Sequence, residues 1–236
     1  MNHPSRLPRN LPSWTAQALL VFRKDLLIEA QTGEVVVTSG FFAVLVVVLS
    51  SMSFFGGPAT GRVVLAGAVW LSVLFAAVLS LGRSWARERE GRALFGLLAC
   101  PLSPSALYAG KCLALLLFLF LIELLTLPLA ALFFSVDLAS YAGPLLLIFL
   151  FATPAIAATG TLFGAMTLRT SARDLALSIV LLPLLSPVVL TAVAATRGLI
   201  TSAADYELFA YLRLLLVMDV TFLGGGLALF GSLIED

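Results

Sequence analysis

The residues able to do chemistry in this 236-residue chain are few, and two carboxylates stand out because they interrupt long apolar runs. Glu123 lies within an apolar run over residues 113–134, and Asp219 lies within another over residues 208–234. A charged side chain at the bilayer centre costs about 2.5–3.5 kcal/mol on insertion scales, so such residues face protein or water. We expect Glu123 and Asp219 to do so. Two roles are open, a proton relay or packing within a helix bundle, and we favour packing.

The other reactive side chains form no catalytic or metal-binding pattern. The sequence holds one histidine, His3, and two cysteines, Cys100 and Cys112. Because the one histidine lies in the N-terminal tail, the sequence offers no haem-ligating histidine inside the membrane and no Ser/His/Asp set, and no His/Cys/carboxylate cluster has metal-ligand spacing. Gly110-Lys111 precedes Cys112 and lacks the Gly-x-x-x-x-Gly-Lys-[Ser/Thr] spacing that cradles phosphate. We expect a non-catalytic chain with no bound cofactor or metal, whose energy comes from elsewhere.

The composition predicts a membrane protein. Hydrophobic residues make up 61% of the chain and charged residues 11%, against roughly 25% charged residues in a soluble domain. The net charge of +1 gives no basic excess for nucleic acid. A helix needs about 20 apolar residues to cross the hydrocarbon core, and the runs do not alternate as spanning strands do. We predict an all-α fold with six transmembrane helices in a domain over residues 35–236. The spans are approximately 35–55, 63–81, 113–134, 142–166, 175–196 and 208–234.

The distribution of Lys and Arg predicts the orientation of the chain, because cytoplasmic loops are enriched in these residues. Six spans place both termini on one side, and eleven of the fourteen basic residues fall there: Arg6, Arg9, Arg23, Lys24, Arg83, Arg87, Arg89, Arg92, Lys111, Arg169 and Arg173. The other side receives Arg62, Arg197 and Arg213. Both termini are therefore expected in the cytoplasm.

The segment before the first span is predicted to be a helix at the cytoplasmic interface. Residues 1–12 are Pro-rich and are expected to be flexible, and residues 13–34 mix apolar and charged side chains. Its apolar face is expected to contain Trp14, Ala18, Phe22 and Leu26, with Asp25 and Glu29 interrupting it. We favour a helix lying on the membrane, anchored by Trp14 and by the stems of Arg and Lys. The alternative is a soluble helix that packs on its own protein.

Proline and glycine predict how the spans pack. Pro154 in the fourth span, and Pro183 and Pro187 in the fifth, are expected to kink their helices. Gly160 and Gly164 form a Gly-x-x-x-Gly pair that permits close helix approach. We favour packing within the chain over dimerisation for this pair.

The longest cytoplasmic connection contains a segment, residues 83–104, that is suited to docking. A charged turn, in which Glu88 and Arg92 are paired at i, i+4, leads into an apolar patch, and Pro101 and Pro104 are expected to end this helix. A solvated loop that returns to the membrane is an equally good interpretation of the composition.

Four stretches of the chain resemble the CcmB (haem exporter protein B) family. The first is Glu88-Arg-Glu-Gly-Arg-Ala-Leu-Phe-Gly-Leu-Leu98, followed by Pro101 and Gly110-Lys111. The others are Gly160-Thr-Leu-Phe-Gly-Ala-Met-Thr-Leu-Arg169 with Ala172-Arg-Asp174, Leu181-Leu-Pro-Leu-Leu-Ser-Pro187, and Tyr211-Leu-Arg213 through Asp219 to the end. The resemblance covers the chain from about Trp14 onward.

The resemblance implies an ABC-2-type permease of the bacterial inner membrane, usually dimeric, in cytochrome c-type biogenesis. It implies a separate ATPase subunit, CcmA, which binds ATP, with CcmC, CcmD and the haem chaperone CcmE nearby. Haem would be the transported or released substrate. The residues expected to couple to the ATPase lie in two cytoplasmic segments: Arg87, Glu88, Arg89, Glu90, Arg92, Leu94, Phe95, Leu98, Arg169, Arg173 and Asp174.

Two other functions share this architecture. An ABC-2 permease for a polysaccharide, a lipid or a drug would have the same spans and the same dependence on an ATPase. A proton-coupled carrier would instead work alone through Glu123 and Asp219.

Overall fold

The computed structural model describes residues 12–54, 57–90, 102–166, 173–202 and 206–235. Within these residues the chain forms seven α-helices, one short 3-10 helix and no strand. The elements are α1 (Trp14–Thr32), α2 (Glu34–Ser53), α3 (Gly57–Glu90), α5 (Pro104–Phe134), η1 (Ala139–Tyr141), α6 (Ala142–Met166), α7 (Arg173–Thr201) and α8 (Leu208–Glu235). All except α1 and η1 are long and apolar enough to cross a membrane. The predicted all-α fold with six apolar spans is confirmed.

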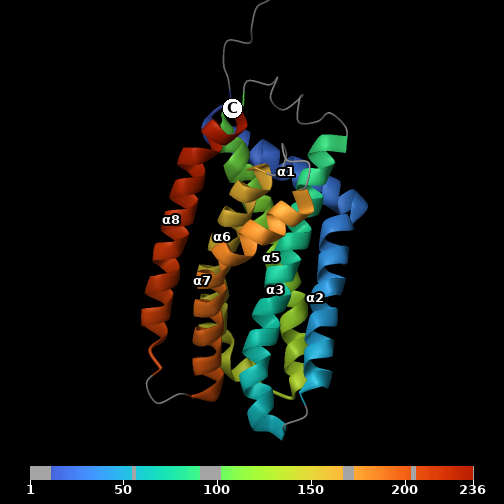
Figure 1. Cartoon of the computed structure of the whole chain (residues 1–236), viewed down its shortest axis with the longest axis vertical. Helices are drawn as coiled ribbons and strands as arrows, with labels where there is room; N and C mark the ends of the chain where they lie inside the picture. Colours follow the sequence, from blue (N-terminus) through green and yellow to red (C-terminus); the bar gives the residue numbers. More distant parts are fainter. Residues whose placement is uncertain (1–11, 55–56, 91–101, 167–172, 203–205, 236) are drawn as a thin grey trace, which may run out of the picture.

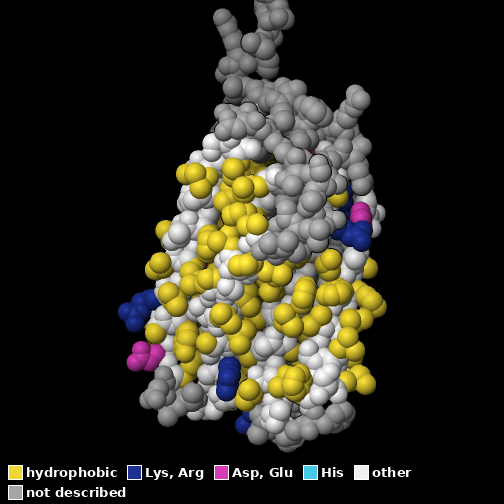
Figure 2. Space-filling view, in the orientation of Figure 1, with side chains coloured by type: hydrophobic (Ala, Val, Ile, Leu, Met, Phe, Trp, Pro, Cys, Tyr) yellow, Lys and Arg dark blue, Asp and Glu magenta, His cyan; other side chains and the backbone are white. Residues whose placement is uncertain are grey.

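The six long helices form an upright bundle, and α1 lies across one of its ends (Figure 1). The C-terminal end of α8 reaches this same end, called the α1 end below. At the centre are α3 and α6, whose apolar windows are 61% and 67% buried, whereas those of α2 and α8 are 28% and 22% buried. Figure 2 shows apolar side chains over much of one face of the bundle. This surface suits lipid contact, because the outward positions of a membrane bundle meet hydrocarbon.

The core is held by aromatic packing between the central helices. The indole of Trp70 in α3 stacks on Phe149 in α6, with ring centroids 4.6 Å apart. Its Nε1 donates a hydrogen bond of 2.9 Å to Thr196 Oγ1 in α7. A buried indole needs a partner for its N–H, so this one side chain fixes α3, α6 and α7 together.

The Gly-x-x-x-Gly pair of α6 packs within the chain, against α3. A Cβ atom at Gly160 would lie 2.5 Å from Leu81 Cδ1, and one at Gly164 would clash with the indole of Trp85. Leu81 and Trp85 are four residues apart on α3, as the two glycines are on α6. The two large side chains therefore fit over the two glycines in the same order along the helices. Within the described chain, the pair therefore serves α3–α6 packing.

The prolines have different effects. Pro154 lies inside α6, and Pro183 and Pro187 lie inside α7, which changes direction in its N-terminal half (Figure 1). Pro104 occupies the first turn of α5, where its missing N–H is not needed. It follows Ser103, whose hydroxyl accepts a hydrogen bond from the Ala106 N–H. The expected end of the preceding helix at Pro101 and Pro104 depends on residues 91–101, which lie outside the described part of the chain.

Candidate functional site: an ionic network and two intramembrane carboxylates

A buried ionic network joins three helices at the α1 end. The Nζ atom of Lys111 in α5 lies 3.0 Å from Asp25 Oδ2 in α1 and 2.5 Å from Glu88 Oε1 in α3. Lys24 of α1 also pairs with Glu88, and its Nζ lies 3.1 Å from Asp25 Oδ1. Glu88 is 3% exposed and Lys111 is 4% exposed. Charges this far from water are tolerated only when they are paired, so the network fixes the relative positions of α1, α3 and α5.

The aromatic ring of Trp85 completes the surroundings of Lys111. The Nζ atom lies 5.2 Å from the ring centroid, within the range of a cation–π contact. Trp85 can occupy this place because Gly164 of α6 leaves room for the indole. Burial lowers the pKa of Lys24, but the carboxylates of Asp25 and Glu88 outweigh burial and leave this pKa raised. Lys24 therefore stays charged at neutral pH.

A second set of ion pairs ties the end of α3 to the corner between α1 and α2. Arg87 Nη2 lies 3.0 Å from Glu29 Oε2, and Arg83 and Arg87 both reach Glu34, at 2.5 and 3.4 Å. The Glu29 carboxylate also accepts hydrogen bonds from the backbone N–H groups of Val35 and Val36, at 3.2 and 2.7 Å. These N–H groups begin α2 and have no partner within it, so Glu29 caps that helix.

The two acids of α1 explain which way this helix faces. Asp25 and Glu29 belong to its buried face with Gln17, Ala18 and Val21, so both acids interrupt the face that contains Ala18, as predicted, and ion pairs satisfy them there. Their partners on α3 and α5 lie far away in the sequence, which local periodicity does not reveal. The large apolar residues Trp14, Leu19, Leu20 and Leu27 are exposed instead. This outward apolar face suits a membrane surface, while the inward face packs on the protein, so α1 combines features of both interpretations.

The intramembrane carboxylates both meet α6, on either side of Pro154. Glu123 of α5 is buried, and its Oε1 accepts a hydrogen bond of 2.7 Å from Thr153 Oγ1. Asp219 of α8 is buried, and its carboxylate lies beside the backbone of Ala155, while its Oδ1 has no hydrogen-bond partner in the described structure. Proline disturbs the backbone hydrogen bonds of its helix, and polar neighbours can replace them. The hydrogen bond from Thr153 favours a packing role between α5 and α6 for Glu123 Oε1.

Known proteins match this chain over most of its length. The family model described as "CcmB protein" matches residues 16–230. The chain belongs to the CcmB family. A relative, "Heme exporter protein B" of Bradyrhizobium diazoefficiens, is 29% identical over 195 residues, which cover 81% of this chain and 86% of that protein. The match begins within α1 and ends within α8, so the ionic network lies entirely within the part that matches the CcmB family.

The structure places only part of the coupling residues expected from the CcmB resemblance. Arg87 and Glu88 lie in the last turns of α3, where Arg87 belongs to the second set of ion pairs and Glu88 to the ionic network. Glu88 points into the protein, where its partners are Lys24 and Lys111. Arg89 and Glu90 end α3, and Arg173 and Asp174 begin α7. The remaining expected residues lie outside the described part of the chain: Arg92, Leu94, Phe95, Leu98 and Arg169.

Sequence reasoning assigned no such role to Lys24, Asp25, Glu29 and Lys111. It counted Lys24 and Lys111 only as markers of the cytoplasmic side. One signal was present: Lys111 comes only two residues before an apolar span, and Asp25 and Glu29 lie four apart among apolar residues. Acids and a lysine flanking spans can pair at the membrane surface, but the sequence does not say which residues meet.

Proposed function

We propose that this chain is the permease subunit of an ABC transporter in cytochrome c biogenesis. It would serve the export of haem or the release of a haem-loaded periplasmic chaperone. The observation that carries the proposal is the match of the CcmB family model to residues 16–230. The name of the Bradyrhizobium relative points to the same cargo. Because the sequence contains no phosphate-binding loop of the Walker A kind, the energy would come from ATP hydrolysis in the partner subunit CcmA.

The proposed complex has CcmA on the cytoplasmic face and CcmC, CcmD and CcmE as further members, with the permease as a homodimer. CcmA would dock on the end of α3 together with the segment that follows it, and on the connection before α7. Arg89, Glu90 and Phe95 are the proposed contacts in the first of these. Arg87 and Glu88 have a different proposed role, since their side chains bind α1, α2 and α5. They would pass a displacement of the α3 end on to these helices.

The function is tested by deleting the gene in its host and restoring it as variants. The unmodified gene is expected to restore c-type cytochromes, measured by haem staining of membrane proteins, and to retain CcmA through purification in mild detergent. Phe95→Ala is expected to reduce CcmA recovery more than Arg89→Ala, because a desolvated aromatic anchor can contribute about 2 kcal/mol or more, whereas rim charges contribute little.

Three outcomes of this experiment would contradict the proposal. If the chain retains a CcmA-type ATPase but deletion of its gene leaves c-type cytochromes unchanged, an ABC-2 permease for another substrate is favoured. Transport without any ATPase subunit would favour the proton-coupled carrier. Equal CcmA recovery from both variants, with unchanged protein levels, would mean that Phe95 is not an anchor.

The proposed location is the bacterial inner membrane, with the α1 end in the cytoplasm. Single cysteines at the exposed positions Gln31 in α1 and Ser140 in η1 are expected to react from opposite sides. The background for both is Cys100→Ser with Cys112→Ser. An impermeant maleimide added to intact spheroplasts is expected to modify Ser140→Cys and to spare Gln31→Cys until the membrane is opened. Modification of Gln31→Cys in intact spheroplasts would contradict this orientation, because it would place the α1 end outside the cytoplasm.

A further inference from the structure

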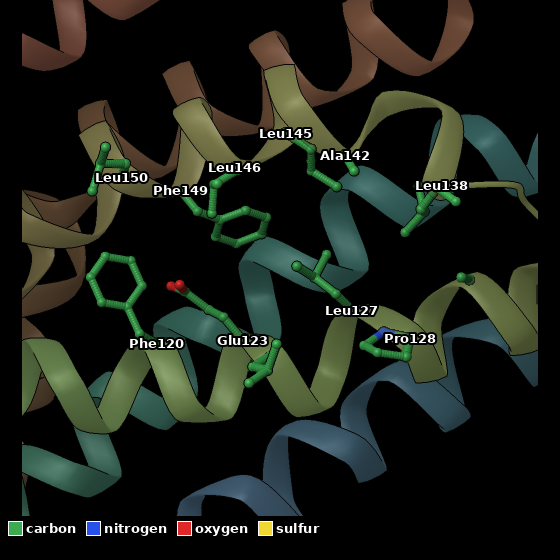
Figure 3. A pocket seen from close by; sticks show the side chains of 13 residues that line it. Phe120, Glu123, Leu127, Pro128, Leu138, Ala142, Leu145, Leu146, Phe149 and Leu150 are labelled. Carbon is green, nitrogen blue, oxygen red and sulfur yellow. The ribbon is translucent and has the colours of Figure 1, made fainter.

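A pocket opens between α5 and α6 in the half of the bundle away from the α1 end. Its volume is about 670 Å³, within the range of small-molecule sites. Glu123 is the one ionisable residue among the residues that line it. Figure 3 shows the Glu123 carboxylate pointing into the pocket, between the rings of Phe120 and Phe149. The remaining lining residues are apolar and come from α5, from Leu138 and Ala139 at the start of η1, and from α6.

The pocket has a buried floor and an exposed rim. Glu123 on the floor is 3% exposed, and Phe149 beside it is also buried, whereas Leu124 and Leu146 on the rim are 71% and 66% exposed. Both rim residues lie on helices that are candidate membrane spans. A molecule would therefore enter sideways, from the hydrocarbon of the bilayer rather than from water.

Only half of the Glu123 carboxylate is satisfied inside the protein. Oε1 accepts the hydrogen bond from Thr153, while the buried Oε2 has no hydrogen-bond partner in the described structure. A buried polar atom without a partner is costly and is expected to find one. An acyl chain that filled the pocket would bring no donor to this atom.

We infer that the α5–α6 pocket binds a membrane-dissolved amphiphile with an apolar body and one hydrogen-bond donor, a hydroxyl or amino group, that pairs with Glu123 Oε2. The apolar body fills the space lined by Phe120, Leu127 and Leu145. Ala131, the last α5 residue that lines the pocket, is eight residues beyond Glu123, or about 12 Å at 1.5 Å per residue, so an elongated body fits along the helix. This site does not depend on the cargo of the transporter.

The test uses Trp70 as a reporter, because its indole stacks on Phe149, which lines the pocket. Trp14→Phe and Trp85→Phe leave Trp70 as the single tryptophan of the full chain. The protein is placed in phosphatidylcholine vesicles and titrated with 2-bromododecan-1-ol, whose bromine lies beside the hydroxyl, or with 2-bromododecane, which lacks the hydroxyl. The alcohol is expected to quench Trp70 at about tenfold lower membrane concentration, the ratio given by one hydrogen bond of about 1.4 kcal/mol.

Two variants connect this preference to the carboxylate. Glu123→Leu is expected to make the two probes equal, and Glu123→Gln, which keeps an acceptor oxygen, is expected to retain part of the preference. Asp219→Asn is the matched control, since it alters the other intramembrane acid, outside the pocket, and the tenfold ratio should remain. Equal quenching by both probes in the unmodified chain would overturn the inference. So would a preference for the alcohol that survives Glu123→Leu, or that is lost in Asp219→Asn.

Discussion

Replacing Lys111 with methionine is expected to lower the free energy of unfolding by about 3–5 kcal/mol, the cost of removing one partner from a buried ion pair. The reason is the balance of charge around this side chain. Without Lys111, the carboxylates of Asp25 and Glu88 are left with Lys24 as their nearest cation. Both acids are buried, so water cannot replace the lost partner.

Thermal unfolding in detergent measures this effect against a matched control. Arg23→Met removes a cation from the exposed side of α1 and should change stability by less than about 0.5 kcal/mol, as surface substitutions usually do. A loss of stability in Lys111→Met no larger than that in Arg23→Met would contradict the interpretation of the network as a buried ionic lock.

A second substitution separates lost pairing from lost packing. In the Lys111→Met background, Glu88→Gln removes one of the two stranded charges and should recover part of the stability. On its own, Glu88→Gln should be destabilising, because Lys111 then loses one of its two carboxylates. This non-additivity is the double-mutant signature of residues in contact, and strictly additive effects would show that the two side chains do not depend on each other.

The apolar spans could be predicted from sequence because a membrane imposes one requirement on every span. About 20 apolar residues must follow one another, and this is visible without knowledge of any tertiary contact. The ends of the helices were less visible: α3 continues to Glu90 and α5 begins at Pro104, so both extend beyond the apolar runs. Charged residues mark the end of a hydrophobic run, but they do not end a helix.

The ionic network could not be predicted because its partners are far apart in the sequence. Glu88 was paired with Arg92 by the i, i+4 rule, whereas the structure pairs it with Lys24 and Lys111. That rule describes an isolated helix and does not include a crossing helix that offers a lysine. Glu123 was visible as a candidate since a carboxylate in an apolar run is unusual, but its partner Thr153 and the pocket depend on how α5 meets α6.

The close approach of α1 to α5 depends on one glycine, which sits next to the lysine of the network. A Cβ atom at Gly110 would lie 2.6 Å from the carbonyl oxygen of Ala18 and 2.6 Å from Val21 Cβ. The first of these is a backbone atom, which cannot move unless α1 moves. We therefore expect Gly110→Val to reduce stability by about 3 kcal/mol, the upper end of the usual overpacking range, and to displace α1 from α5.

Gly82→Val is the matched control for this change. Gly82 lies within α3, and a Cβ atom there would meet nothing within 4 Å, so the same substitution adds the same side chain without the clash. A cysteine at Ala18, in a background lacking Cys100 and Cys112, reports whether α1 has moved, because this position is buried in the packed state. Its reaction with a maleimide should be slow with Gly82→Val and severalfold faster with Gly110→Val.

The same pair of variants tests whether the ionic network needs this close approach. Lys111 follows Gly110 directly, so a displaced α1 would carry Asp25 away from Lys111 while Glu88, on α3, stays within reach. Lys111→Met should then cost less in the Gly110→Val background than in the Gly82→Val background. Equal costs in the two backgrounds, together with slow cysteine reaction in both, would mean that α1 accommodates the larger side chain without leaving α5.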